Sequence, residues 1–146
     1  MHTHADKNVG TYLDRTLKLV KQHYLRVFRE NGADISTEQW VIIDQLKANN
    51  GISQTELANG SYKNAPTVSR IIDLLVKKGL VERQRFKNDR RRYKIYLTQS
   101  GIDLHERLLP KVYELRQTSW AGLNEQDWEN LKRIMAKVQE NFEAVE

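Results

Sequence analysis

Hydrophobic residues recur at helical spacing near both ends of the chain. Near the N-terminus they advance by four, three, four and three residues, at Leu13, Leu17, Val20, Tyr24 and Val27. Near the C-terminus the steps are three, four, three and four, at Trp128, Leu131, Met135, Val138 and Phe142. A stripe of this kind follows one face of an α-helix. The pattern therefore predicts helices over about residues 8–30 and 125–143.

Four segments carry the pattern that begins a helix, at residues 35–40, 52–57, 97–102 and 123–128. Each has a Ser, Thr or Asn whose side-chain oxygen can accept an otherwise unpaired backbone N–H. Apolar residues on either side fix the entry angle of the chain. These starts predict helices over 37–48, 54–59, 99–121 and 125–143. Pro110 is expected to bend the helix over 99–121.

In the middle of the chain the period of the pattern changes. A helix is predicted over 64–77, with Pro66 in its first turn, where the missing N–H matters little. Beyond it, apolar and polar residues alternate, and β-branched and aromatic side chains are frequent. This pattern predicts antiparallel strands over 81–87 and 92–97, joined by a turn at Asn88–Asp89.

Positive charge is concentrated in one quarter of the chain. Residues 61–98 contain eleven Lys or Arg against three Asp or Glu, whereas the remainder contains thirteen positive and sixteen negative side chains. The whole chain of 146 residues carries a formal net charge of +5. Charge segregated in this way indicates a surface that meets phosphates. The alternative is a solvated basic face without a ligand.

The composition narrows the classes of function. The absence of cysteine excludes disulfides, thiolate metal sites and cysteine-based oxidant sensing, and it fits the cytoplasmic location that we expect. No apolar run approaches the roughly 18 residues of a membrane span, and no signal peptide opens the chain. We find no phosphate-cradling glycine loop, activated nucleophile or metal-ligand spacing, and His23 and His105 are isolated. We therefore expect no enzyme, no cofactor and no metal site.

A short helix, a turn, a second helix and a basic hairpin together predict a winged helix-turn-helix. The second helix, over 64–77, is then the recognition helix, whose N-terminal part contacts base edges in the major groove. Its apolar stripe of Val68, Ile71, Ile72 and Leu75 is expected to face the core. The alternative is an ordinary amphipathic helix with a polar outer face. The candidate DNA-binding residues are Ser61, Lys63, Asn64, Ala65, Thr67, Arg70, Lys87, Arg90, Arg91 and Arg92.

The hairpin, which we call the wing, carries three consecutive arginines at 90–92. A wing of this charge can follow the DNA backbone and insert one Arg into a narrow minor groove, where the negative potential is high. Asp89 would repel phosphate there, and two roles are open for it. It can pair with the Arg91 side chain and fix its direction, or it can simply form the turn.

Several segments together resemble the MarR family of bacterial transcription regulators. They are ISTEQW at 35–40, ISQTELA at 52–58, APTVSRIIDLLVKKGLVER at 65–83, DRR at 89–91 and LTQSG at 97–101. The Asp-x-Arg wing followed by Leu-Thr-x-x-Gly is the most specific part. The match covers essentially the whole chain in order and spacing.

The resemblance implies a homodimer that binds a palindromic operator in double-stranded DNA, acts as a repressor, and is often released by a small ligand. It makes Arg91 the minor-groove residue and Asp89 its orienting partner. The implied fold is mainly α with a small β-wing (α+β), as a single domain over 1–146. A winged helix-turn-helix core at 36–98 would be flanked by dimerisation helices at 8–30 and 99–144.

The two terminal stripes are candidates for the dimer interface, through Leu13, Leu17, Trp128, Leu131, Met135, Val138 and Phe142. Intramolecular packing alone is the alternative. A ligand pocket would lie where these helices join the winged core, with Tyr24, Trp40 and His105 as candidate lining residues. A core role is the alternative for each of these three. The competing function is a winged-helix module that binds RNA or protein, because fold alone does not fix function.

Overall fold

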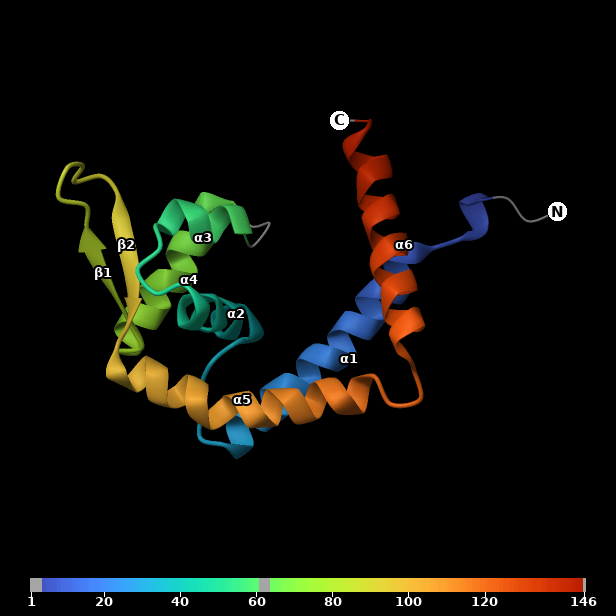
Figure 1. Ribbon diagram of the computed structural model, residues 1–146, viewed down its shortest axis with the longest axis horizontal. Helices are drawn as coiled ribbons and strands as arrows, with labels where there is room; N and C mark the ends of the chain where they lie inside the picture. Colours follow the sequence, from blue (N-terminus) through green and yellow to red (C-terminus); the bar gives the residue numbers. More distant parts are fainter. Residues whose placement is uncertain (1–3, 61–63, 146) are drawn as a thin grey trace. The chain divides into compact units, whose positions relative to one another are not determined.

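The computed structural model describes residues 4–60 and 64–145, which form a mainly helical fold with one small antiparallel sheet (Figure 1). Every predicted helix and strand is present in it, with ends within two residues of the predicted ones. The elements are a 3-10 turn (His4–Asp6), α1 (Val9–Glu30), α2 (Thr37–Ala48), α3 (Gln54–Gly60), α4 (Ala65–Lys77), β1 (Val81–Arg85), β2 (Tyr93–Leu97), α5 (Gln99–Ser119) and α6 (Glu125–Glu143).

The predicted helix caps are formed in the structure. At the start of α2, Ser36 Oγ accepts from the Gln39 N–H and Gln39 Oε1 accepts from the Ser36 N–H, each at 3.0 Å. Asn124 and Asp127 form the same reciprocal pair at the start of α6. At the start of α3, Ser53 Oγ accepts from the Glu56 N–H at 3.1 Å. Each bond satisfies a backbone donor that a helix start leaves unpaired, so local sequence determines where these helices begin.

The loop between α2 and α3 joins the sheet as a third extended segment. β1 and β2 pair in antiparallel register, with Arg85 opposite Tyr93. On the other edge of β2, the Ile95 N–H donates to Ile52 O at 2.9 Å and the Gly51 N–H donates to Ile95 O at 2.8 Å. The paired loop leads directly into α3, so it places α3 beside the hairpin. Periodicity did not predict this third segment, because it is too short to show a period.

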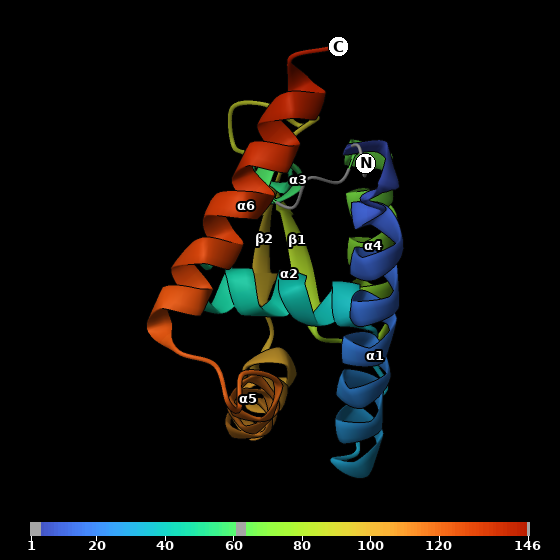
Figure 2. The ribbon, with the colours of Figure 1, turned by 90° about the vertical axis from the view of Figure 1, so that its right-hand side faces the viewer.

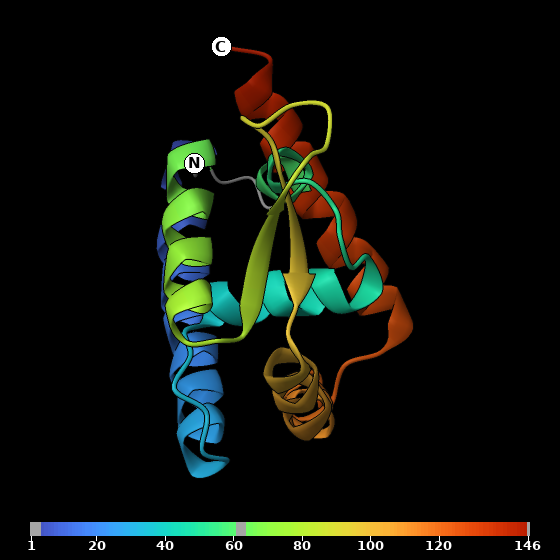
Figure 3. The ribbon, with the colours of Figure 1, turned by 90° about the vertical axis from the view of Figure 1, so that its left-hand side faces the viewer.

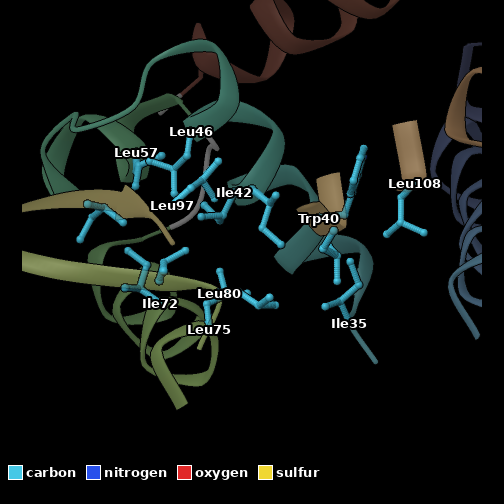
Figure 4. Packing of buried hydrophobic residues seen from close by; sticks show 14 of the residues in the cluster. Ile35, Trp40, Ile42, Leu46, Leu57, Ile72, Leu75, Leu80, Leu97 and Leu108 are labelled. Carbon is cyan, nitrogen blue, oxygen red and sulfur yellow. The ribbon is translucent and has the colours of Figure 1, made fainter. Parts of the chain in front are cut away.

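The hydrophobic core lies between α2, α3, α4 and the sheet, and it continues past Trp40 of α2 to Phe28 of α1 and Leu108 of α5 (Figure 4). The α4 stripe faces inward as predicted, since Val68, Ile72 and Leu75 are fully buried and Ile71 is partly buried. Figures 2 and 3 show α2 running crosswise to the two strands, with α4 alongside β1. This packing holds the inner face of α4 against the core and leaves its outer face free to meet a partner.

The start of α5 is held tightly against the start of β1. Thr98 Oγ1 donates to Gly79 O at 2.6 Å and accepts from the Gly101 N–H at 3.1 Å. A Cβ on Gly101 would lie 2.2 Å from the backbone oxygen of Leu80, so no side chain fits there. These contacts give the Leu-Thr-x-x-Gly motif a structural reason, because it closes the hairpin onto the following helix.

The chain divides into two compact units, residues 1–112 and 113–146, with the boundary inside α5. In the second unit the indole rings of Trp120 and Trp128 meet edge to face, 5.3 Å apart. No described residue of α6 is buried.

Pro110 lies within α5, and the bend expected there stays a prediction. Among the described residues, none of the helices has the length and apolar character that crossing a membrane requires.

Candidate nucleic-acid interface

The predicted base-contacting residues lie at the N-terminal end of α4, off its buried stripe. Asn64 caps the helix, because its Oδ1 accepts from the Thr67 N–H at 2.9 Å. Its side-chain amide N–H groups remain available as donors. Asn64, Ala65 and Arg70 are exposed and Thr67 is partly buried. Arg70 Nη2 lies 3.4 Å from Thr67 Oγ1, a long contact that holds it weakly. The other two candidates on this stretch, Ser61 and Lys63, lie outside the described residues.

Asp89 forms the turn at the wing tip. Its Oδ1 accepts from the backbone N–H of Arg91 at 3.0 Å, and its backbone O accepts from the Arg92 N–H at 3.2 Å. Asp89 and Arg91 are both described, and their side chains form no ion pair in the structure. The structure shows the contacts of the turn-forming role, one of the two considered from sequence, and the orienting role stays a prediction. A carboxylate used in this way leaves the exposed Arg91 side chain free to point outward.

Four cationic side chains of the wing lie over two aromatic rings, Phe86 on one face of the hairpin and Tyr93 on the other. Arg92 lies 4.3 Å and Lys94 5.2 Å from the centre of the Phe86 ring. On the opposite face, Arg83 and Arg85 each lie 5.8 Å from the centre of the Tyr93 ring. Contacts of this kind are worth about 0.5–1 kcal/mol at exposed sites. Sequence reasoning counted the charges but missed the rings, although the alternation of cations with Phe and Tyr was visible.

Arg83 is a further residue at this interface that sequence reasoning did not single out. It occupies the inward face of β1, opposite the fully buried Ile95. Its guanidinium donates to Asp73 and to the backbone oxygen of Ser69 on α4, and to Gln54 on α3. The signal available in the sequence was an Arg at an inward position of the strand, where an apolar residue is the usual choice.

One pocket brings the wing and the recognition helix to the same surface. It has a volume of about 310 Å³ and opens between α3, the start of α4 and the wing. Its lining residues are Gln54, Thr55, Ala58 and Asn59 from α3, Asn64 and Ala65 from α4, and Arg91, Arg92 and Tyr93 from the wing. Arg90 and Lys87, the remaining wing candidates, are exposed at the tip.

The three residues suggested for ligand binding take part in a row of aromatic contacts. The Trp40 and His105 rings stack in parallel at 5.0 Å, and each residue is only 3% exposed. Phe28 lies 5.9 Å from Trp40 and 5.9 Å from Tyr24. His105 Nε2 lies 2.8 Å from Asp44 Oδ1. These contacts agree with the core role considered as the alternative, and a ligand-lining role stays a prediction.

The apolar stripes predicted for a dimer interface are largely uncovered. Leu13 and Leu17 on α1 are 44% and 52% exposed, and Phe142 on α6 is 68% exposed. Trp128 and Leu131 are exposed, whereas Met135 and Val138 are partly buried.

Within residues 4–60 and 64–145, no three His, Asp or Glu side chains lie close enough together to hold a metal ion.

The fold and the site define a class of protein. A helix-turn-helix whose second helix exposes its polar N-terminal face, followed by a hairpin with exposed arginines, is the architecture of winged-helix DNA-binding proteins. The family model described as MarR family matches residues 35–93, which span α2 to the first residue of β2.

Relatives and solved structures extend the match to nearly the whole chain. The chain is 31% identical to the transcriptional regulator FarR of Neisseria gonorrhoeae over 137 residues, which cover 92% of this chain and 90% of FarR. It resembles the crystal structure of the S. aureus MepR–DNA complex with a TM-score of 0.81 and 30% identity, covering 92% of this chain and 99% of that one. The chain belongs to the MarR family.

A third comparison concerns the fold alone. The PcaV regulator of Streptomyces coelicolor, solved with its natural ligand, has a TM-score of 0.76 at 21% identity, covering 96% of each chain. Taken together, the family and its relatives make this chain a DNA-binding transcription regulator rather than an enzyme. The predictions of family, fold class and non-enzymatic function are confirmed.

Proposed function

We propose that the chain is a homodimeric repressor that reads a palindromic operator, with α4 in the major groove and Arg91 in the adjacent minor groove. The observation that carries the proposal is the pocket of about 310 Å³ that the first residues of α4 and the wing arginines line together. A DNA duplex offers its two grooves side by side with phosphates between them. A surface with an amide-bearing helix start next to exposed arginines matches that arrangement in shape and charge.

We propose residues 36–98 as the DNA-reading core within a single functional domain, with α4 reading bases through Asn64, Thr67 and Arg70. Arg offers guanine a bidentate pair, Asn offers the same to adenine, and a Thr methyl can touch thymine. Lys87, Arg90 and Arg92 are proposed as phosphate contacts, which position the protein without reading sequence. A DNA-reading protein works where the chromosome is, which supports the expected cytoplasmic location.

Dimerisation is proposed for the helices at 8–30 and 99–144. Their apolar stripes at helical spacing are exposed in the single chain, and burying such a surface in water is favourable. A two-fold dimer would present two copies of α4 about one helical turn of DNA apart, roughly 34 Å. That geometry is what a palindromic operator requires.

A small-molecule effector is proposed as the releasing signal. PcaV, which shares the fold, has been solved with its natural ligand. An effector would act only through different affinities for a DNA-competent and an incompetent arrangement of the two reading heads. Tyr24, Trp40 and His105 lie on α1, α2 and α5, so a ligand that disturbed their aromatic contacts would act where the flanking helices α1 and α5 meet α2 of the core.

The proposal is tested by selecting duplexes from a random DNA pool at near-physiological salt with three proteins. They are the wild type, Arg91→Ala and, as a control with the same charge change outside the interface, Arg133→Ala on α6. We expect an enriched inverted repeat. Arg91→Ala should bind it more weakly, with the salt slope reduced by about one phosphate-equivalent.

Arg133→Ala should retain both affinity and slope. Salt-sensitive retention without any enriched sequence would contradict sequence-specific binding and favour the RNA- or protein-binding alternative. An Arg91→Ala variant that behaves like the wild type would remove the wing from the mechanism.

A further inference from the structure

Arg83 joins three elements of the DNA-reading core through one guanidinium group. On α4, Nη1 pairs with Asp73 Oδ1 at 2.5 Å and Nη2 donates to the backbone oxygen of Ser69 at 3.0 Å. On α3, Gln54 Oε1 accepts from Nε at 3.1 Å. The group also lies over the ring of Tyr93 on β2, 5.8 Å from its centre. Each guanidinium nitrogen thus has a partner on a helix, while the Cα belongs to the wing.

Its burial and its ion pair with Asp73 distinguish Arg83 from the arginines at the wing tip. Its side chain is 21% exposed, whereas Arg90, Arg91 and Arg92 are exposed residues at the wing tip. A cation that is paired with a carboxylate and bonded through all its nitrogens has little capacity left for a phosphate. The Arg83 guanidinium therefore binds groups of the protein itself and is not left to contact DNA.

The positions of its partners indicate what Arg83 controls. Ser69 and Asp73 lie one helical turn apart on α4, on the side that faces β1. Gln54 is the first residue of α3, the first helix of the helix-turn-helix. The wing has only two strands and is braced on one side by the short segment before α3. A two-stranded ribbon is weakly stable by itself, so its angle to α4 depends on bonds of this kind.

We propose that Arg83 is a positioning residue that locks the wing to the recognition helix, so that the two groove-reading elements bind DNA as one rigid unit. The proposal deepens the proposed function and rests on it for the DNA-binding part. Without the lock, the wing arginines would remain on the protein but would have to be ordered when DNA binds. The entropy of that ordering would weaken binding.

A purely structural role is the competing explanation, and Arg83→Lys is the variant that separates the two. Lys keeps the positive charge near Asp73 but cannot supply three donors in a fixed fork. Asp73→Asn is the complementary change, because it removes the charge and keeps the shape of the partner. The matched control is Arg85→Gln, since Arg85 lies on the same strand over the same ring but is exposed.

The first measurement uses the free protein and needs no operator. Hydrogen exchange of backbone amides is compared between wild type, Arg83→Lys, Asp73→Asn and Arg85→Gln. We expect hairpin amides beyond Arg83 to exchange about tenfold faster in the first two variants, which is what losing one charge-assisted hydrogen bond produces. Amides of α2 should stay as protected as in the wild type. Unchanged hairpin exchange, or faster exchange throughout the chain, would overturn the lock.

The second measurement is a double-mutant cycle on the selected duplex. Arg91→Ala is introduced into the wild type, into Arg83→Lys and into Arg85→Gln. If Arg83 acts through the wing, the fold-loss of affinity caused by Arg91→Ala should be about tenfold smaller in the Arg83→Lys background than in the wild type. In the Arg85→Gln background the fold-loss should equal that in the wild type. Additive losses for Arg83 and Arg91 would overturn the proposal.

The two measurements separate the two proposals. If none of the proteins selects a duplex, the proposed function fails, while the exchange data still decide whether Arg83 holds the wing. If the wild type selects an operator and Arg83→Lys leaves hairpin exchange unchanged, the proposed function stands and the lock is refuted.

Discussion

At the residue scale, the wing tip contains one acidic side chain, Asp89, which forms the turn that carries the neighbouring arginines. The Asp89 carboxylate accepts a hydrogen bond from the Arg91 backbone N–H, and the Asp89 backbone oxygen accepts one from the Arg92 N–H. The backbone bends and the arginine side chains are left outside the turn. The same composition with the acid one residue away would present a carboxylate to the phosphates without forming this turn. In the proposed function, the position of the acid, more than the net charge, makes the tip suitable for DNA.

Arg70 provides a test of base reading. Replacing Arg70 with Ala should change the sequence preference at one position in each half-site, at a cost of about 1–3 kcal/mol for the preferred base, because a bidentate pair with that base is lost. Arg70→Lys is the matched control, since it keeps the charge without the fork. Selection from random duplexes measures both variants. A uniform loss of affinity across sequences for Arg70→Ala, with Arg70→Lys unaffected, would make Arg70 a phosphate contact instead.

Gly101 provides a test of close packing. Gly101→Ala should lower the free energy of unfolding by about 1–3 kcal/mol, because the added Cβ would meet the Leu80 backbone oxygen, which has little freedom to move. Gly10→Ala on α1 is the control, where a Cβ would only meet the Asn8 side chain at 3.8 Å. That change should stabilise the helix by up to about 1 kcal/mol. Urea denaturation measures both, and equal stability of the two variants would contradict the close approach.

At the element scale, α4 is a stable helix and, in the proposed function, also a DNA-reading surface, and Asn64 takes part in both roles. Its Oδ1 caps the helix, so only its amide N–H groups are left to face a base. The inner face of the helix is fixed by buried residues, while the outer face near its start carries the polar side chains of Thr67 and Arg70. This division lets the outer residues change without unfolding the core.

Asn64→Asp separates the cap from the DNA contact. Asp caps as well as Asn and suits the positive end of the helix, so unfolding should cost the same or up to about 1 kcal/mol more. Operator affinity should fall, because the carboxylate faces phosphates and lacks the amide donors. Asn124→Asp makes the same charge change at the cap of α6 and should leave operator affinity unchanged. Equal affinity of both variants and the wild type would place the start of α4 away from DNA.

Prediction at the element scale succeeded where local chemistry decides the structure. Caps such as Ser36 with Gln39 and Asn124 with Asp127 act between residues three apart, so the sequence shows them directly. The pairing of Ile52 with Ile95 and the bonds of Arg83 to Asp73 and Gln54 join residues far apart in sequence. Their partners depend on how the elements pack, which periodicity does not contain.

At the scale of the whole molecule, the apolar stripes of α1 and α6 are the main feature that the single chain leaves unexplained. Leu17 and Phe142 are more than half exposed, and no described residue of α6 is buried. Side chains at helical spacing that stay in water predict a partner surface. A second copy of the chain is the partner that the family resemblance implies.

Leu131→Glu should dissociate the proposed dimer. A carboxylate in the centre of an apolar interface loses its hydration without gaining a partner, which weakens association by several kcal/mol. Ala136→Glu makes the same charge change on another face of α6 and should leave the dimer intact. Sedimentation velocity measures the assembly, and circular dichroism checks that the helices persist. A Leu131→Glu protein that sediments as the wild type does would place the interface elsewhere.

The sequence alone determined the order of the elements, the ends of the helices, the inner face of α4 and the basic character of the wing. Each of these depends on residues within a few positions of one another, through caps, periodicity or local charge. Only the folded chain shows the rest: the ring contacts of the wing cations, the burial of Trp40 against His105, and the bonds of Arg83 to two helices. These are choices among partners that the sequence leaves open, and only packing brings one partner within bonding distance.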